Sequence, residues 1–298
     1  MRSDHRCRIA AALTVLALAL VSAGCGDDET TTTTTGAAAA AVQKYAANTT
    51  MGEIQSRGEI TIGVKYDVPP FGFKNTRTGD IEGFDVDLGK AVADKLGVRT
   101  KLVEAISDNR IPFIKDGTVD LVLSTMTINA ERAKEIGFTD PYFIAHGRIL
   151  VPKDSKIAGV ADLAGRKVCT ALGSTYEETV KKQAPKADLK LVDAYSDCLE
   201  LLQNGAVDAI STDDVILTGM IIQDDSLKLV GNELTTEPYG GGFKKGDTAF
   251  AEFLDGVLAE YKSDGRWKTS YDKWLGRYTG ETAEPPTEKL ADVLKQAS

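Results

Sequence analysis

Arg110 lies where a cation needs a partner. The segment AISDNRIPFIKDG (residues 105–117) places it between small polar residues and an apolar run typical of a core. A guanidinium cannot be deprotonated in a protein, and burying it unpaired is costly. We therefore expect Arg110 to hold an anion. Its position leaves open whether that anion is a ligand or an internal acid such as Asp108 or Asp120.

A second arginine follows the segment STMTINAER (residues 124–132). A strand is expected to end in its hydroxyl residues, with Asn129 as the N-cap of a helix and Arg132 in the first turn. A cation is disfavoured at the positive end of a helix. This arrangement predicts that a bound carboxylate compensates Arg132.

Another expected junction between a strand and a helix is ALGSTYEETV (residues 171–180). After the strand end at Ala171, Ser174 and Thr175 lead into a helix whose free N–H groups form an anion site. Simple capping by either hydroxyl explains the same pattern, and the two roles do not exclude each other. We include all three residues in the candidate site.

The third junction, ISTDDVIL (residues 210–217), ends a strand at Thr212, Asp213 and Asp214. One aspartate can cap the following helix while the other faces a cleft and suits an ammonium group. Together the three junctions supply partners for a carboxylate and for an ammonium, which is the complement of an α-amino acid.

Short β-type runs alternate with helical segments from residue 57 onward, and this rhythm predicts a parallel α/β sheet with ligands at the strands' carboxyl ends. Two segments, FIKDGTVDLVLST (113–125) and LLQNGAVDAISTD (201–213), echo each other. We interpret them as corresponding parts of two related lobes. Residues 147–156 and 237–247 are expected to carry the chain between the lobes, with a cleft between them.

The segment GFDVDLGKAVADKL (residues 83–96), together with TMTINAER, GSTYEE and TDD, resembles the extracellular solute-binding proteins of family 3, the amino-acid receptors of ABC importers. The resemblance covers about residues 57–278 and implies a two-lobed periplasmic-binding-protein-like (type II) α/β fold. It implies that Arg132, helped by Thr127 and the turn at Ser174 and Thr175, holds the ligand α-carboxylate. Asp213 would hold the α-ammonium with the Thr125 carbonyl and the Thr127 hydroxyl.

SDNRIP resembles the glutamate/aspartate branch of that family, where the matching serine and arginine contact the side-chain carboxylate. We therefore expect Ser107, Arg110 and Lys65 to bind a distal carboxylate, Arg110 through a bidentate fork. Tyr195 and Thr212 are further candidates at this end of the pocket. The alternatives are a receptor for glutamine, asparagine or another polar amino acid, and a Lys65 that is a solvated surface residue.

An enzyme is the rival class, because some relatives of this fold are dehydratases. The chain has no G-x-S-x-G, H-E-x-x-H or P-loop motif, and His146 is the one histidine beyond the leader. We expect a structural role for His146, no catalytic residues, no cofactor and no metal. A ligand-binding module of a signalling receptor is the other alternative.

The N-terminal residues predict an exported lipoprotein. Residues 1–24 have a basic start and a short apolar run, and LVSAGC resembles a lipobox that places lipid on Cys25. A simple secretory signal is the alternative. Residues 25–50 are rich in threonine and alanine and are expected to tether the protein to the outer face of the cytoplasmic membrane.

Cys169 and Cys198 remain in the folded part, and an even pair in an oxidising compartment predicts a disulfide, with two separate thiols as the alternative. The formal net charge of −9 and the scattered basic residues argue against nucleic acid as a partner. We expect a monomer that delivers its ligand to membrane permease and ATPase subunits. Lobe 1 is expected to comprise residues 51–148 and 240–298, and lobe 2 residues 149–239.

Overall fold

The computed structural model describes residues 42–280 and 282–296, which are organised around two mixed β-sheets. The first has the strand order β5-β1-β6-β14-β7 and the second β10-β9-β11-β8-β12. The first sheet consists of β1 (Glu59–Val64), β5 (Arg99–Glu104), β6 (Leu121–Val122), β7 (Gly137–Phe138) and β14 (Gly242–Phe243). The second consists of β8 (Phe143–Pro152), β9 (Lys167–Ala171), β10 (Asp188–Val192), β11 (Ala209–Asp213) and β12 (Leu227–Val230). We call the parts of the chain around these sheets lobe 1 and lobe 2.

Helices cover both sheets, as the alternation of elements predicts. Those of lobe 1 are α1 (Thr50–Arg57), α2 (Phe84–Leu96), α3 (Arg110–Asp116), α4 (Ala130–Glu135), α8 (Thr248–Ser263), α9 (Arg266–Tyr271), the π-helical turn η2 (Asp272–Gly276), α10 (Arg277–Thr279) and α11 (Leu290–Gln296). Those of lobe 2 are the 3₁₀ turn η1 (Val160–Leu163), α5 (Thr175–Gln183), α6 (Tyr195–Gln203) and α7 (Asp214–Gln223). A small third sheet joins β2 (Asp67–Val68), β3 (Gly72–Lys74) and β4 (Ile81–Glu82).

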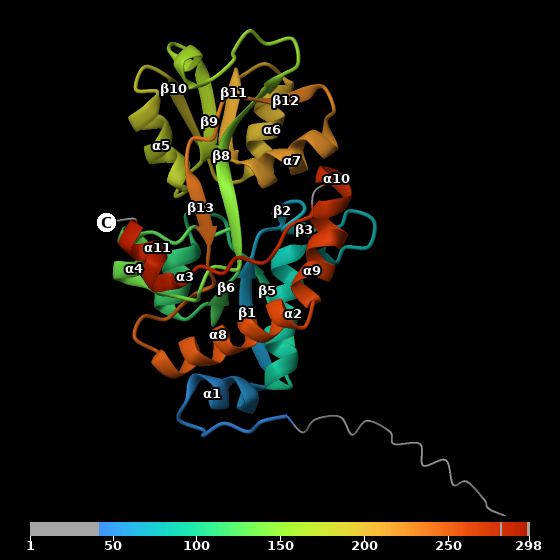
Figure 1. The fold of residues 1–298 in the computed structure, drawn as a ribbon, viewed down its shortest axis with the longest axis vertical. Helices are drawn as coiled ribbons and strands as arrows, with labels where there is room; N and C mark the ends of the chain where they lie inside the picture. The colour runs from blue at the N-terminus through green and yellow to red at the C-terminus, as the bar shows by residue number, and fades with distance from the viewer. Residues whose placement is uncertain (1–41, 281, 297–298) are drawn as a thin grey trace, which may run out of the picture. The chain divides into compact units, whose positions relative to one another are not determined.

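Two strands connect the lobes. The ten-residue strand β8 begins in lobe 1 and continues into the second sheet, and β13 (Thr236–Tyr239) returns antiparallel beside its first half (Figure 1). The register pairs Tyr239 with Phe143 and Glu237 with Ala145. This confirms the predicted two-lobed fold with two hinge strands. The numerical lobe boundaries predicted above stay predictions.

Both sheets are mixed rather than parallel throughout. β1 pairs in parallel with β5 and β6, and β9 with β10 and β11, as the βαβ pattern predicts. The antiparallel pairs are those of β8 with β11 and β12 in the second sheet and of β14 with β6 and β7 in the first. The prediction of a parallel sheet was therefore right only for the βαβ units.

The echoing segments form equivalent helix–strand units. Helix α3 is followed by its C-cap Gly117 and leads to β6, and helix α6 is followed by its C-cap Asn204 and then Gly205 and leads to β11. Both glycines have positive φ (77° and 74°), which is disfavoured for residues with a Cβ. The Asp-Gly and Asn-Gly signals thus mark helix stops in both lobes.

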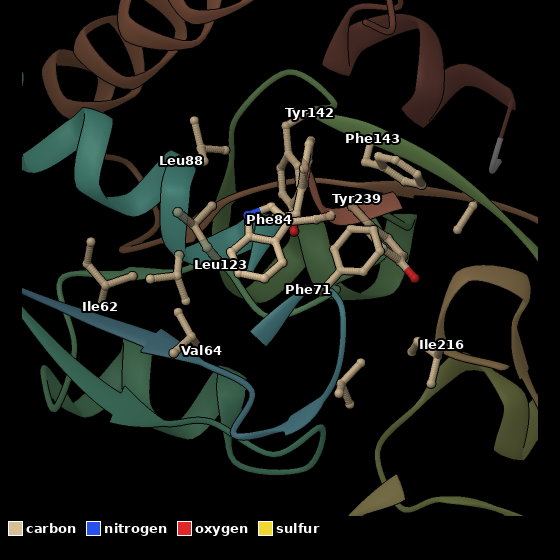
Figure 2. Close-up of a cluster of buried hydrophobic side chains, with 14 of the residues drawn as sticks. Ile62, Val64, Phe71, Phe84, Leu88, Leu123, Tyr142, Phe143, Ile216 and Tyr239 are labelled. Atoms are coloured by element: carbon tan, nitrogen blue, oxygen red, sulfur yellow. The ribbon is translucent and has the colours of Figure 1, made fainter. Parts of the chain in front are cut away.

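An aromatic cluster supports the hinge from lobe 1 (Figure 2). The rings of Phe143 in β8 and Tyr239 in β13 both lie against Phe71, with centroids 5.0 and 5.6 Å away. Trp267 stacks near Phe143 and is almost fully buried, as is Trp274, so both tryptophans pack in the core. The lobe 1 end of each hinge strand, the start of β8 and the end of β13, is therefore packed in the core.

In lobe 2, Cys169 and Cys198 form the predicted disulfide, which joins β9 to α6. The linked residues are 29 positions apart, and closing such a loop stabilises a fold by roughly 3 to 4 kcal/mol in the chain-entropy model.

The predicted leader, the lipidation of Cys25 and the tether up to residue 41 lie outside the described residues. The next residues belong to the packed structure: the Tyr45 amide donates to Gln55, and its ring contacts Phe253. Packing therefore begins within the range expected to be tether. None of the helices in the described ranges combines the length and apolar character needed to cross a membrane.

Candidate ligand-binding site

A small cavity lies where polar residues from the two lobes meet. Its volume is about 10 Å³, which is room for about one water molecule. The lining residues are Ser107, Arg110, Thr125, Thr127, Arg132, Ser174, Thr175, Tyr176, Tyr195 and Asp213. All but Tyr176 are residues that the sequence singled out, so the three junctions and the SDNRIP segment do converge.

The Arg110 side chain is 2% exposed and is held by backbone carbonyl groups. Its Nε donates to the Ser107 carbonyl (3.1 Å) and its Nη1 to the carbonyls of Ser124 (2.9 Å) and Thr125 (3.0 Å). Its Nη2 points across the cleft to the Gly173 carbonyl at 3.5 Å. Carbonyl groups orient the guanidinium but do not neutralise it.

The internal acids proposed as alternative partners do not pair with Arg110. Asp120 forms an ion pair with Arg57 (2.5 Å) and accepts from the Thr61 amide. Burial and the positive charge of Arg132 lower the pKa of Arg110 to about 9, so it remains a cation at neutral pH. Arg110 therefore brings an unneutralised positive charge to this end of the cavity.

Lys65 lies next to Arg110, and both contact Ser107. Its side chain is 1% exposed, so the alternative of a solvated surface lysine is wrong. Its Nζ donates to the Ser107 hydroxyl (2.9 Å) and lies 5.7 Å from the Tyr195 ring centroid. Burial, followed by the charge of Arg110, lowers the pKa of Lys65 to about 7. An anion bound here would favour its charged form.

Arg132 projects from the start of α4, where the Asn129 side chain accepts from the Arg132 amide at 2.9 Å, which confirms the predicted N-cap. Its Nη1 donates to the Thr127 carbonyl (2.8 Å) and its Nη2 to the Gly173 carbonyl across the cleft (3.0 Å). Burial lowers the pKa of Arg132, and the negative charge of Glu237 opposes this shift.

Asp213 ends β11 and faces Arg132 from lobe 2. It accepts a hydrogen bond from the Tyr176 hydroxyl (2.8 Å). Burial, and then the negative charge of Glu237, raise the pKa of Asp213 to about 8. Asp214 is the first residue of α7 and accepts from the amides of Val215 and His146, whereas Asp213 occupies the N-cap position without a side-chain cap bond, so neither carboxylate caps the helix as the sequence suggested.

The loop after β6 is held in an uncommon conformation. Thr125 has φ of 44°, in the left-handed region that residues with a Cβ rarely adopt. Its amide donates to the buried carboxylate of Asp85 (3.0 Å), which also accepts from the Tyr142 hydroxyl (2.8 Å). Burial raises the pKa of Asp85 to about 7. This anchor directs the Thr125 carbonyl towards Arg110, and backbone strain of this kind clusters at functional sites.

Ala171 and Thr212 lie beside the cavity rather than along it. Both are fully buried, and the Ala171 carbonyl accepts from the Ser174 amide at 3.2 Å. The Thr212 hydroxyl is buried without a hydrogen-bond partner among the described residues.

Sequence reasoning missed Tyr176, Asp85 and Glu237. Tyr176 directly follows the hydroxyls of GSTYEE, so the motif itself contained its signal. Glu237 is 3% exposed in β13, and its carboxylate accepts from the hydroxyls of Thr127 (2.6 Å) and Thr175 (3.0 Å). Only the pairing of hinge strands brings it there, which no local pattern reveals.

Comparisons with known proteins show which proteins this chain is similar to. The ABC transporter glutamine-binding protein GlnH of Bacillus subtilis (strain 168) is 40% identical over 236 residues, which are 78% of this chain and 86% of that protein. The glutamate-binding protein GluB of Corynebacterium efficiens is 33% identical over 242 residues, covering 76% of this chain and 81% of that protein.

A solved structure of an ancestral arginine-binding protein bound to glutamine superposes with a TM-score of 0.70 at 39% identity, and the match covers 74% of this chain and 99% of that one. Residues 60–277 match the family described as bacterial extracellular solute-binding proteins, family 3. Because this match spans well over half of the chain, the protein belongs to the family 3 bacterial extracellular solute-binding proteins.

Proposed function

We propose that this amino-acid-binding protein of an ABC importer captures an acidic amino acid, glutamate or aspartate, and delivers it to a membrane permease. The observation that carries the acidic ligand is the pair of buried cations, Lys65 and Arg110. They meet around Ser107 without an acidic side chain of the described residues paired to either. Two buried cations without an anion are costly, and a ligand carboxylate would relieve that cost.

Each end of such a ligand has a partner in the cavity. The α-carboxylate binds Arg132 and the free amides at the start of α5, and the α-ammonium binds Asp213. The distal carboxylate binds Arg110 and Lys65, next to Ser107, with Tyr195 and Thr212 at the same end. These contacts require Arg132 and Arg110 to exchange part of their carbonyl partners for the ligand.

Ligand entry requires the lobes to separate, because the cavity holds only about 10 Å³. Bound ligand would bridge Arg132 in lobe 1 and Asp213 in lobe 2, contacts that coexist only when the lobes are close. Closure is then driven by the difference in ligand affinity between the two conformations. The closed form would be the one that docks on the permease.

Glutamine is the second candidate ligand. The glutamine-binding relative is more similar (40% identity) than the glutamate-binding one (33%). An amide could accept hydrogen bonds from Arg110 and Lys65, but it would leave their charges unneutralised.

We also propose that the protein is a monomer, anchored through Cys25 at the outer face of the cytoplasmic membrane. We propose further that it is not an enzyme; turnover of prephenate-like acids would contradict this.

Calorimetric titration of the purified protein, refolded to remove carried-over ligand, tests the proposal. Glutamate, aspartate, glutamine, asparagine, histidine and arginine form the panel. We expect tight binding of glutamate or aspartate alone. Preference for an amide or a basic amino acid would contradict the assignment of Arg110 and Lys65, while leaving the roles of Arg132 and Asp213 intact.

Replacing Arg110→Ala tests the distal end separately. Loss of a buried charge partner costs about 2 to 5 kcal/mol, so glutamate affinity should fall about 30-fold to several thousand-fold. Glutamine affinity should fall less, because an amide loses only hydrogen bonds. Arg57→Ala is the matched control, since Arg57 pairs with Asp120 away from the cavity and should leave affinity unchanged. Unchanged glutamate binding by Arg110→Ala would refute the assignment.

A further inference from the structure

Glu237 places a buried carboxylate at the hinge, behind two hydroxyls of the cleft. The residue lies in β13, opposite Ala145 of β8, and is 3% exposed. One oxygen, Oε2, accepts from Thr127 Oγ1 of lobe 1 at 2.6 Å and from Thr175 Oγ1 of lobe 2 at 3.0 Å. A single carboxylate oxygen therefore joins both lobes to the hinge.

These two bonds determine what the hydroxyls can offer a ligand. A threonine hydroxyl has one proton and two lone pairs. Because Thr127 and Thr175 both give their protons to Glu237, their oxygens can only accept further hydrogen bonds. Both residues line the small cavity together with Asp213. A ligand ammonium can donate to all three, whereas a ligand carboxylate gains nothing from either hydroxyl.

Glu237 itself lies outside the residues that line the small cavity. It lines the larger adjoining groove, which it shares with Thr127 and Thr175. Its effect on a ligand therefore passes through the hydroxyls and through its negative charge. That charge also acts on both ends of the predicted amino-acid clamp, since it raises the pKa of Asp213 and opposes the lowering of the pKa of Arg132.

We infer that Glu237 is a specificity-determining positioning residue: by taking the hydroxyl protons of Thr127 and Thr175, it turns both oxygens into acceptors and makes the cleft select a primary ammonium group. The inference rests on the proposed function in that it takes the ligand to be an α-amino acid. It also assigns the Thr175 hydroxyl to the ammonium rather than to the α-carboxylate. Arg132 and the backbone amides of α5 are left as the donors for the carboxylate.

The test compares each amino acid with an analogue that lacks only the α-amino group. Wild type and Glu237→Gln are titrated with L-glutamate and glutarate, and with L-glutamine and glutaramate. The glutamine side chain keeps the volume but removes the charge, so a neutral amide oxygen holds the two hydroxyl protons less strongly and lets them turn towards a ligand in the cavity. Affinity for the amino acid should fall about 10-fold to 100-fold, as expected for a lost hydrogen bond to a charged group. Affinity for the analogue should stay the same or rise.

Thr175→Val is the second variant and covers the case in which Glu237→Gln does not fold. It removes one acceptor oxygen and leaves Glu237 in place, so it should weaken binding of the amino acid and spare the analogue. If the Thr175 hydroxyl instead donated to the α-carboxylate, Thr175→Val would weaken both ligands equally. Equal losses for both members of a pair, in either variant, would overturn the inference and indicate a purely structural role.

The same titrations separate this inference from the proposed ligand. Wild-type preference for glutamine over glutamate would overturn the acidic ligand, and the glutamine–glutaramate pair would then decide the role of Glu237. Wild-type binding of an analogue as tight as its amino acid would overturn the inference alone. Binding of neither amino acid would overturn both.

Discussion

Lys65 and Arg110 place two positive charges in one buried environment, and their different chemistry gives them different roles. A guanidinium keeps its charge even when it is desolvated, whereas a buried ammonium loses its proton much more readily. This difference appears in the lowered pKa values, about 9 for Arg110 and about 7 for Lys65. Arg110 is therefore a permanent cation at neutral pH, and Lys65 is a cation whose charge depends on the ligand and on the pH.

The preference for glutamate over glutamine should consequently depend on pH. Below about pH 7 Lys65 is charged and attracts the distal carboxylate; above pH 7 glutamate must bind together with a proton. The ratio of glutamate to glutamine affinity should fall about tenfold between pH 6 and pH 8. Calorimetry with both ligands across this range measures the ratio. Asp213 titrates in the same range, but its effect cancels because both ligands carry the α-ammonium.

Lys65→Met is the control for this pH effect. Methionine keeps much of the side-chain length and has no ionisable group, so the affinity ratio should lose most of its dependence on pH, and the remainder would come from Asp85, whose pKa is also about 7. Glutamate affinity at pH 6 should fall towards that for glutamine. A ratio that stays constant from pH 6 to pH 8 in the wild type would show that Lys65 does not face the distal group.

At the scale of the elements, the site could be predicted because it is built at ends of strands and helices. Local patterns mark where β6, β9 and β11 end, and parallel strands bring such ends to one edge of a sheet. This argument holds within each sheet; that Arg132 of lobe 1 and Asp213 of lobe 2 meet across one cleft was implied by the family resemblance. Lys65 was assigned only through the resemblance, because nothing in its neighbourhood distinguishes it from a surface lysine.

Other elements could not be predicted because they depend on contacts that are distant along the chain. Glu237 precedes a proline in a short strand, and its partners Thr127 and Thr175 are 110 and 62 positions away. The antiparallel pairs of β8 with β12 and β13 likewise arise only once the chain has crossed between the lobes. Hydrophobic periodicity predicts the element, but tertiary contacts determine its partner.

Helix α4 provides a test of how an element positions a side chain. Asn129→Ala removes the cap that accepts from the Arg132 amide, and such a loss costs about 0.5 to 2 kcal/mol of stability. Because Arg132 lies in the same turn, ligand affinity should fall as well. Thr49→Ala is the control: it removes the N-cap of α1, away from the cavity, and should cost similar stability without changing affinity. Urea unfolding and calorimetry measure the two quantities, and equal affinity in both variants would show that the cap does not position Arg132.

At the scale of the whole molecule, two glycines allow the lobes to approach closely. A Cβ on Gly173 would lie 2.6 Å from the Asp108 Cα, and a Cβ on Gly219 would lie 1.8 Å from the Pro69 carbonyl oxygen. In each pair one residue belongs to lobe 2 and the other to lobe 1. The same approach allows the Ser196 amide to donate to Asp67 at 3.1 Å. Small residues at these positions are thus a condition for the arrangement in which the cavity residues meet.

Gly219→Ala should therefore act on closure rather than on folding. Gly219 lies inside α7, where alanine is a better helix former than glycine by roughly 0.5 to 1 kcal/mol, so a conformation with separated lobes should not lose stability. In the closed arrangement the added Cβ would overlap a backbone oxygen, and overpacking costs about 1 to 3 kcal/mol, which corresponds to an affinity loss of about 5-fold to 150-fold. Gly256→Ala in α8 is the matched control, because a Cβ there meets nothing within 4 Å, and it should raise stability without changing affinity. Calorimetry gives the affinity, and small-angle scattering at saturating ligand should show a larger radius of gyration for Gly219→Ala alone. If Gly219→Ala bound ligand as tightly as Gly256→Ala, ligand binding would not require the close approach of α7 to Pro69, and this prediction would be wrong.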